Sequence, residues 1–272
     1  MCELLGVSIT PGATMGVYFK AFRPRAEGNQ SGWGVGWYES GRTRVIKEAA
    51  RADESQKALA LIEDPPASHL FVIHVRRATV GAVSEANTHP FCASLRGREW
   101  LFAHNGTVQG LERLAVNGFT PIGETDSEVA FHYLLTRLQK LEEGAGEDRE
   151  AAEILDAARE LSRDGKVNFL LTDGRNLYAY HDGHTSVHFL KRDPRGAHSV
   201  HLDDESDYVV DLEVSGNRDE RAVIVASVPL TNEPWTKLHA GDFLICRDGS
   251  IIDLVSSGTA DPSFVSPKTA NR

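Results

Sequence analysis

Cysteine is scarce in this chain of 272 residues, with copies at positions 2, 92 and 246 alone. Three scattered cysteines are too few for a disulfide framework or a cysteine-rich zinc site. The chain also lacks any apolar run near the roughly 18 residues that a membrane-spanning helix requires. Its first residues have neither the basic segment nor the apolar core of a secretory signal peptide. We therefore expect a cytoplasmic protein that does not bind to membranes.

Basic residues are also few, with 29 Lys and Arg against 39 Asp and Glu and a net charge of −10. Proteins that bind nucleic acids usually present a basic face, so this balance opposes a nucleic-acid partner. It leaves room for a small anionic substrate, which needs one well-placed arginine. The 11 histidines show no His-Glu-x-x-His spacing, and Gly32-x-Gly34-x-Gly36 lacks the strand-then-helix context of a dinucleotide loop. We expect no metal and no other cofactor.

The apolar pattern predicts short strands, then two helices, then strands again. Strands are expected at 2–9, 33–38, 43–47, 69–76, 100–105, 167–172, 177–181, 185–191, 222–228, 242–246 and 250–254. Helices are expected at 14–23 and 53–62 and around the apolar stripes of 130–141 and 154–161, with capping-box spacing from Thr125 to Glu128. This order favours an α+β fold with stacked sheets. Residues 256–272, rich in Ser, Pro, Thr and Ala, are expected to form a mobile tail.

Cys2 follows the initiator methionine, where a small side chain permits removal of Met1. Removal would leave Cys2 with a free α-amine, whose reference pKa is near 8, beside a thiol with a reference pKa near 8.5. One residue would then supply both the nucleophile and its base. The alternative is a buried cysteine that acts as a small hydrophobic residue.

Three further segments combine polar residues with apolar strands or helix starts. Arg76 ends an apolar strand and can bind a carboxylate, or it is an ordinary surface arginine. Asn105 and Gly106 offer donors for an oxyanion, or they form a common Asn-Gly turn. Asp126 can bind an ammonium group, or it simply favours the first turn of a helix. His89 is expected to be a structural histidine that forms hydrogen bonds. Each segment is ambiguous when taken alone.

Together these segments occur in an order that resembles the class II glutamine amidotransferase domain of the N-terminal-nucleophile hydrolases. The motifs, in order, are Cys2, His74-x-Arg76, His104-Asn105-Gly106 and Glu124-Thr125-Asp126-Ser127-Glu128. The start Met-Cys-Glu-Leu-Leu-Gly, the Gly-Trp-Gly segment, Asn87-Thr88-His89-Pro90-Phe91, and Pro229-Leu230-Thr231 with Trp235 are similar to its stand-alone, YafJ-type branch. The resemblance spans about residues 1–255.

The resemblance implies a four-layer αββα sandwich of two mainly antiparallel sheets, forming one domain over residues 1–255. It implies that Cys2 attacks the side-chain amide of glutamine and that its α-amine is the general base. The side chain of Asn105 and the backbone N–H of Gly106 would form the oxyanion hole. Arg76 would bind the α-carboxylate of glutamine, and Asp126 its α-ammonium. Ammonia would leave, and water would hydrolyse the γ-glutamyl thioester.

The chain departs from the synthase-linked members, which typically read His-Thr-Arg-Trp-Ala-Thr-His-Gly, because Arg77 and Val80 replace the Trp and the second His. Coupling to an acceptor site is therefore in doubt, and any ammonia acceptor would be a separate synthase subunit. A homo-oligomer also stays open. Two other functions remain: hydrolysis of a different γ-glutamyl amide without an acceptor, and a catalytically silent binding subunit.

Overall fold

Two antiparallel sheets form the centre of the computed structural model, which describes residues 2–11, 20, 22, 29–78, 81–193, 199–201, 209–211 and 221–256. The seven-stranded sheet has the order β13 (Thr236–Lys237), β9 (His188–Arg192), β12 (Ala222–Ala226), β1 (Glu3–Ile9), β4 (Leu70–Arg76), β2 (Gly32–Glu39) and β3 (Arg42–Glu48). The six-stranded sheet has the order β15 (Ser250–Val255), β14 (Phe243–Arg247), β8 (Leu177–Tyr180), β7 (Lys166–Thr172), β6 (Arg98–Thr107) and β5 (Phe91–Leu95).

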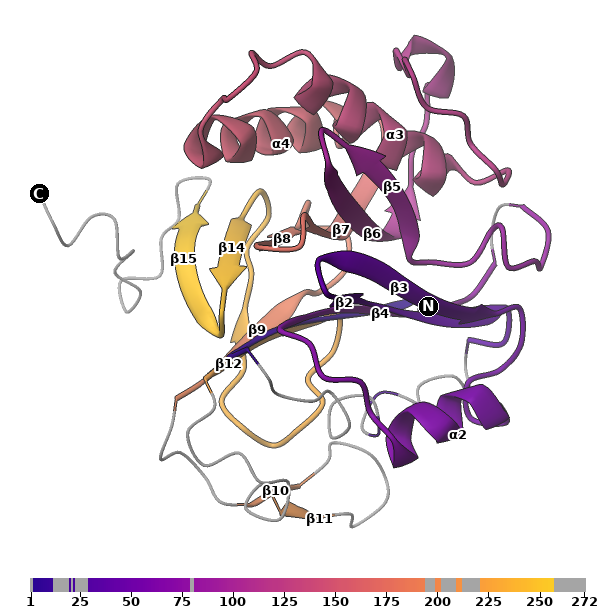
Figure 1. The fold of residues 1–272 in the computed structure, drawn as a ribbon, viewed down its shortest axis with the longest axis vertical. Helices are drawn as coiled ribbons and strands as arrows, with labels where there is room; N and C mark the ends of the chain where they lie inside the picture. Colours follow the sequence, from indigo (N-terminus) through magenta and orange to yellow (C-terminus); the bar gives the residue numbers. More distant parts are fainter. Residues whose placement is uncertain are drawn as a thin grey trace, which may run out of the picture.

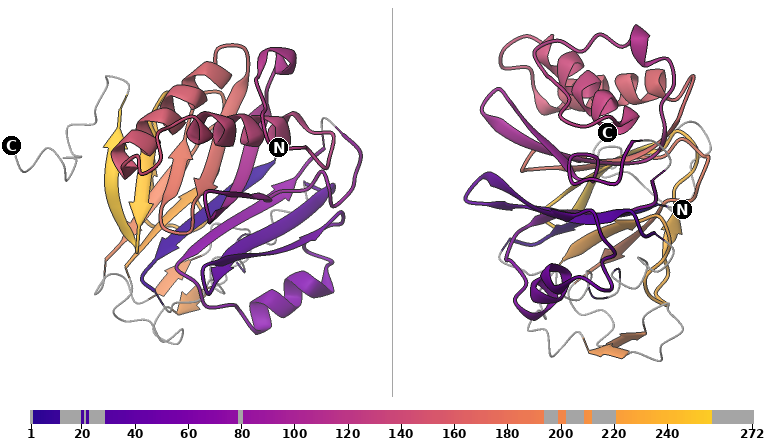
Figure 2. Two further views of the ribbon diagram at one scale, coloured as in Figure 1. Left: turned by 45° about the horizontal axis from the view of Figure 1, so that its top comes forward. Right: turned by 90° about the vertical axis from the view of Figure 1, so that its right-hand side faces the viewer.

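Helices cover the outer faces of both sheets (Figure 1). The helices α3 (Asp126–Gln139) and α4 (Glu147–Leu161) lie on the six-stranded sheet, and α2 (Gln56–Glu63) lies on the seven-stranded sheet. The views of Figure 2 show the resulting four layers in the order helix, sheet, sheet, helix. The structure thus confirms the expected α+β sandwich. A short 3-10 turn (Leu111–Arg113) and a two-stranded ribbon, β10 (Ser199–His201) with β11 (Val209–Asp211), complete the described elements.

The apolar core has three parts because each sheet buries both of its faces. Side chains along β1 point alternately to the two faces of its sheet. Leu5, Val7 and Ile9 pack on the α2 side, whereas Leu4 packs between the sheets. The cluster between the sheets also contains Val72. A third cluster joins the six-stranded sheet to α3 and α4. Burial on two faces explains why the central strands are continuous apolar runs in the sequence.

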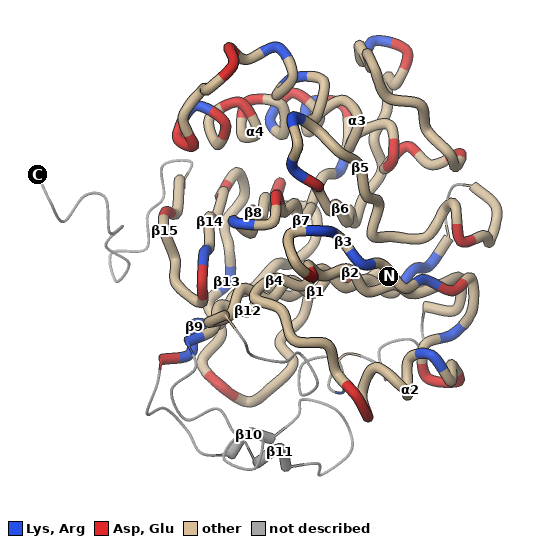
Figure 3. The backbone as a smooth tube through the Cα atoms, viewed as in Figure 1, with Lys and Arg blue, Asp and Glu red and all other residues tan. Residues whose placement is uncertain are grey.

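Ion pairs join α3 to α4 on the outside of the sandwich. Arg137 of α3 donates to Glu153 at 2.6 Å and to Glu160 at 2.7 Å, both on α4. Burial lowers the pKa of Arg137, but its bonds to the Tyr133 hydroxyl and to Glu153 outweigh burial and raise the pKa, so the guanidinium stays charged. Figure 3 shows acidic and basic residues close together along this helix pair.

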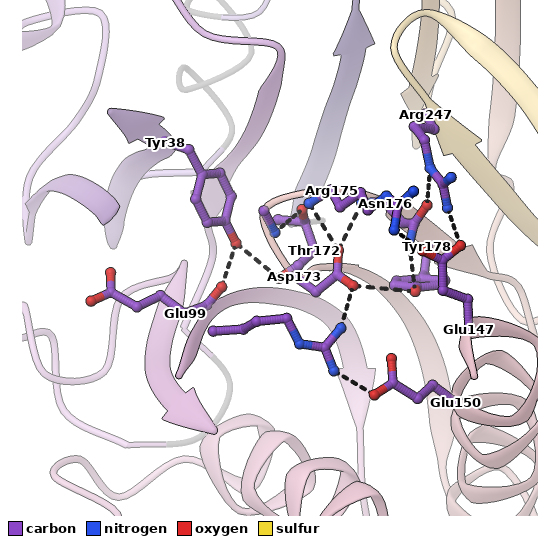
Figure 4. A network of polar contacts seen from close by, with 12 residues as sticks. Tyr38, Glu99, Glu147, Glu150, Thr172, Asp173, Arg175, Asn176, Tyr178 and Arg247 are labelled. Atoms are coloured by element: carbon purple, nitrogen blue, oxygen red, sulfur yellow. Dashed lines mark hydrogen bonds and ion pairs between the residues drawn. The ribbon is translucent and has the colours of Figure 1, made fainter. Parts of the chain in front are cut away.

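A polar network closes the end of the sandwich away from the start of β1 (Figure 4). The hydroxyl of Tyr38 lies 2.9 Å from the carbonyl oxygen of Glu99 and 3.0 Å from that of Thr172, so one side chain of β2 contacts two strands of the other sheet. Beside it, the buried carboxylate of Asp173 accepts from Arg98 at 3.0 Å. This network holds the two sheets and α4 at a fixed spacing.

Several expectations need correction. The strand Phe91–Leu95 was not predicted, and β9 begins at His188 rather than at residue 185. His74 lies on β4 and His104 on β6, which belong to different sheets. The predicted helix 14–23 lies almost wholly outside the described residues, as do residues 257–272 of the predicted tail. None of the helices in the described ranges is long and apolar enough to cross a membrane.

Candidate functional site

Cys2 is held at one end of the sandwich by the two strands that flank β1. Glu3 is in register with Val75 of β4, which places Cys2 beside the residues that follow that strand. On the other side, Ser227 bonds the backbone of Leu4 twice, through its hydroxyl at 3.0 Å and its N–H at 3.1 Å. The start of β1 is therefore held by hydrogen bonds on both sides.

The half-buried sulfur of Cys2 contacts the backbone of Arg77. The N–H of Arg77 donates to Sγ at 3.0 Å, and the Cys2 thiol lies 3.1 Å from the Arg77 carbonyl oxygen. A thiol can use both contacts, whereas a thiolate keeps the bond from the N–H. Burial raises the pKa of the Cys2 thiol, while the Arg77 N–H and the charge of Arg76 act in the opposite direction. The surroundings thus contain groups that stabilise a thiolate once it forms.

Asn105 and Gly106 reach this site from the facing sheet. They lie within β6, in register with Asn168 and Val167 of β7, so the Asn-Gly pair is not a turn. The buried side chain of Asn105 donates through Nδ2 to the carbonyl oxygen of Cys2 at 2.5 Å. A Cβ at Gly106 would lie 1.8 Å from the Lys166 carbonyl oxygen, so no other residue fits there. At Gly106, next to Asn105, β6 and β7 therefore leave no room for a side chain.

Arg76 is the last residue of β4 and is only 4% exposed. Its guanidinium donates to the carbonyl oxygens of Ala82 at 3.1 Å and Gly81 at 3.5 Å. Both of these partners are neutral carbonyl groups, and they orient the guanidinium. Burial lowers the pKa of Arg76, but an arginine stays protonated in proteins. The strand thus delivers a fixed positive charge next to Cys2.

Asp126 is the first residue of α3, after the N-cap Thr125. Thr125 accepts from the N–H of Glu128 at 3.3 Å, as the capping-box spacing predicts. The Glu128 carboxylate departs from that pattern, because it accepts from the N–H groups of Ile122 and Gly123 instead. One oxygen of the buried Asp126 carboxylate accepts from the Val108 N–H at 2.6 Å. This bond ties the start of α3 to the end of β6.

Three histidines lie between the layers near these residues. His104 contacts Ser127 Oγ at 2.9 Å and the Lys166 carbonyl oxygen at 3.1 Å, which anchors α3 to the sheet. The rings of His74 and His89 are 4.4 Å apart and fully or almost fully buried. Within the described part of the chain, none of their nitrogens has a hydrogen-bond partner, so the expected bonding role of His89 is wrong. Burial lowers the pKa of His74 to about 3 and that of His89 as well.

The four segments singled out in the sequence therefore meet. Cys2 contacts Asn105 directly and contacts Arg77, the neighbour of Arg76. Asp126 accepts a hydrogen bond from Val108, which follows the strand of Asn105. Sequence reasoning missed the backbone of Arg77, since backbone groups leave no sequence signal. It also missed the part played by Ser127, although that residue stood in a quoted motif. In the described ranges, no group of three or more metal-ligating side chains comes together.

Comparisons with known proteins identify the family of this chain. The family model of the class II glutamine amidotransferases matches residues 1–269. An uncharacterized protein of Methanocaldococcus jannaschii is 38% identical over 257 residues, covering 93% of this chain and 71% of that protein. YafJ of Escherichia coli is 35% identical over 260 residues, covering 93% of this chain and 100% of YafJ. The crystal structure of a predicted glutamine amidotransferase from Pseudomonas aeruginosa has a TM-score of 0.69 and 28% identity, over 92% of this chain and 99% of that one.

Proposed function

The chain belongs to the class II glutamine amidotransferases, and we propose that it hydrolyses the side-chain amide of glutamine with Cys2 as the nucleophile. The observation that carries this proposal is the convergence at Cys2. Its sulfur accepts the Arg77 N–H at 3.0 Å, and its carbonyl oxygen accepts the Asn105 amide at 2.5 Å. Residues 1–255 would act as a single catalytic domain in the cytoplasm, without a metal or other cofactor.

The first chemical step forms a thioester. After removal of Met1, the free α-amine of Cys2 takes the proton of the thiol, and Sγ attacks the amide carbon of glutamine. The C–S bond forms as the carbonyl oxygen becomes an oxyanion. Nδ2 of Asn105 carries two hydrogens, and one already bonds the Cys2 carbonyl oxygen. The second hydrogen and the Gly106 N–H are assigned to the oxyanion.

The remaining steps release both products. The oxyanion collapses, the C–N bond breaks, and the leaving nitrogen takes a proton from the α-ammonium of Cys2 to depart as ammonia. Water, deprotonated by the same amine, then attacks the γ-glutamyl thioester. Cleavage of the C–S bond yields glutamate and regenerates the thiol. No residue other than Cys2 is needed to carry protons.

Recognition of the substrate is assigned to the two buried charges of the site. Arg76 suits the α-carboxylate of glutamine, because a guanidinium binds a carboxylate through two parallel hydrogen bonds. Asp126 suits the α-ammonium because its carboxylate is negatively charged, and the Val108 N–H fixes the position of one carboxylate oxygen. Both charges contact only the glutamyl end of a substrate. A γ-glutamyl amide other than glutamine is therefore the second candidate substrate, with no ammonia acceptor required.

The test measures glutamate and ammonia released from glutamine by the wild-type protein and by Cys2→Ala. We expect release by the wild type and background rates from Cys2→Ala. Cys92→Ala is the matched control, because Cys92 is an exposed cysteine on β5, and it should keep the wild-type rate. Intact-mass analysis of the same samples should show loss of Met1.

Equal rates in the wild type and Cys2→Ala would remove Cys2 from the mechanism, and retained Met1 in an active protein would remove the α-amine as base. A panel of γ-glutamyl amides separates the two substrates, since a much higher kcat/KM for another amide would displace glutamine. If the folded wild type hydrolyses none of these amides, the remaining function is that of a catalytically silent binding subunit. If ammonia is passed on, its acceptor is a separate synthase subunit, whose addition should raise glutamine turnover.

A further inference from the structure

We propose that Asn87 is a positioning residue that sets the spacing between the two substrate-binding charges, Arg76 and Asp126. This inference rests on the proposed function and extends it to a residue that touches neither substrate nor nucleophile. An α-amino acid carries its carboxylate and its ammonium on one carbon. A site that binds both groups must therefore hold its own two charges at a fixed separation.

The side-chain amide of Asn87 bridges the two segments that carry these charges. Its Nδ2 donates to the carbonyl oxygen of Ala82 at 3.0 Å, and its Oδ1 accepts from the N–H of Glu124 at 2.7 Å. Asn87 is only 2% exposed, so these bonds form away from competing water. The amide has one orientation here, because its donor faces a carbonyl and its acceptor faces an N–H.

The first of these bonds leads to Arg76. The Ala82 carbonyl oxygen that accepts from Asn87 also accepts from Nη1 of Arg76, at 3.1 Å. A carbonyl oxygen has two lone pairs, so both donors can bond it together. Asn87 thus fixes the oxygen against which the Arg76 guanidinium is oriented.

The second bond leads to Asp126. Glu124, whose N–H is held by Asn87, immediately precedes the N-cap Thr125, and Asp126 follows as the first residue of α3. The carboxylate of Glu124 also lies 3.5 Å from the N–H of Ala82. The two segments are therefore joined directly as well as through Asn87, and the amide is the buried part of the connection.

Glycines on either side make room for this amide. A Cβ at Gly81 would lie 2.9 Å from Asn87 Nδ2, and the φ of Gly81 is +75°, a conformation that favours glycine. A Cβ at Gly123 would lie 2.3 Å from Asn87 Oδ1. Neither glycine contacts substrate in the proposed mechanism. Their small size is instead explained by the close approach of the Asn87 side chain to both segments.

The experiment compares Asn87→Ala and Asn87→Asp with the wild type. Asn87→Asp keeps the volume and the acceptor for Glu124 but loses the donor to Ala82. We expect both variants to raise KM for glutamine about 10- to 100-fold while kcat changes less than about threefold. The binding of glutamine by Arg76 and Asp126 is weakened, whereas the reacting groups at Cys2 are unchanged. Asn176→Ala is the control, since Asn176 is equally buried in the polar network at the far end. It should lower thermal stability without changing KM.

A second readout uses two alkylating agents that react with Cys2. A glutamine analogue with a diazoketone in place of the amide carries both substrate charges, whereas iodoacetamide carries neither. We expect the variants to slow inactivation by the analogue in proportion to KM and to leave the iodoacetamide rate unchanged. A structural disturbance of Cys2 would slow both reagents alike.

Each outcome decides the proposal. Folded Asn87 variants with an unchanged KM, or with a lowered kcat alone, overturn the role of Asn87 and leave the proposed function intact. Failure of both variants to fold makes Asn87 structural and also overturns the positioning role. A wild type that neither hydrolyses glutamine nor reacts with the analogue overturns the proposed function, and the role of Asn87 falls with it.

Discussion

The side chain of Asn105 donates a hydrogen bond of 2.5 Å to the backbone carbonyl oxygen of Cys2, across the gap between the two sheets. Asn105 belongs to the six-stranded sheet, and Cys2 precedes a central strand of the seven-stranded sheet. The proposed nucleophile and its proposed oxyanion donor are therefore held together by direct contact. Their relative position depends on how the two sheets pack.

Replacement of Asn105 should lower catalytic rate more than substrate affinity. Asn105→Ala removes one donor to the oxyanion, and the loss of one such donor typically lowers kcat about 10²- to 10³-fold. KM for glutamine should change only a few-fold, because Arg76 and Asp126 remain. Steady-state kinetics measures both parameters. An unchanged kcat in a folded variant contradicts the assignment.

Asp126→Asn should weaken binding of the substrate while the fold is kept. The amide oxygen of asparagine can still accept from the Val108 N–H, which Asp126 holds at 2.6 Å. The negative charge for the α-ammonium is lost, and a hydrogen bond to a charged group is worth about 1.5–3 kcal/mol. KM for glutamine should therefore rise about 10- to 100-fold. A γ-glutamyl substrate without its α-amine should be less affected, and equal effects on both substrates would contradict this role.

Gly106→Ala should destabilise the protein. The added Cβ would lie 1.8 Å from the Lys166 carbonyl oxygen, so β6 and β7 must separate locally. Overpacking of this kind costs about 1–3 kcal/mol or more. Gly146→Ala is the matched control, because nothing lies within 4 Å of a Cβ there. Urea unfolding compares the two, and equal stabilities would show that the strands tolerate a side chain at this point.

The burial of His74 should make stability depend on pH below neutrality. Its pKa is about 3 in the folded protein, against about 6.5 when unfolded, so the unfolded state binds the proton first as pH falls. The stabilising contribution is complete above pH 6.5 and declines below it, by up to about 1.4 kcal/mol per pH unit until about pH 3. His74→Phe removes this group, so the free energy of unfolding of the variant should fall less steeply between pH 6 and 4 than that of the wild type. Denaturant titrations at each pH measure both free energies, and an equal decline in the two proteins would contradict the prediction.

The polar network at the far end should affect stability without affecting catalysis. The Asp173 carboxylate accepts from Arg98 at 3.0 Å and from the N–H groups of Arg175 at 2.9 Å and Asn176 at 2.7 Å. Asp173→Ala removes these bonds from a buried site, and we expect a loss of about 2 kcal/mol. Because Cys2 lies at the opposite end of the strands from Asp173, kcat and KM at 25 °C should stay at wild-type values. A change in KM would show that the two ends are coupled.

Local sequence pattern predicted much of the fold because the central strands are buried on both faces and read as apolar runs. The strand Phe91–Leu95 escaped prediction, since only its first and last residues are buried. The placement of His74 and His104 in different sheets could not be read from local pattern, because strand order depends on pairing between distant segments. Cys2 next to Asn105 was expected from the family resemblance. Asn87 was part of a quoted motif, but its bonds go to backbone groups, which no sequence pattern identifies.

The central position of β1 has a consequence for the order of events during synthesis. One neighbour of β1 is β4, and the other is β12, whose following residue Ser227 bonds Leu4. The pairing of β1 is therefore complete only after residues 222–227 have been made. At about 5–20 residues per second, that delay is on the order of tens of seconds. Until then the edge of β1 that faces β12 has no partner strand, so the start of β1 is open to solvent on that side.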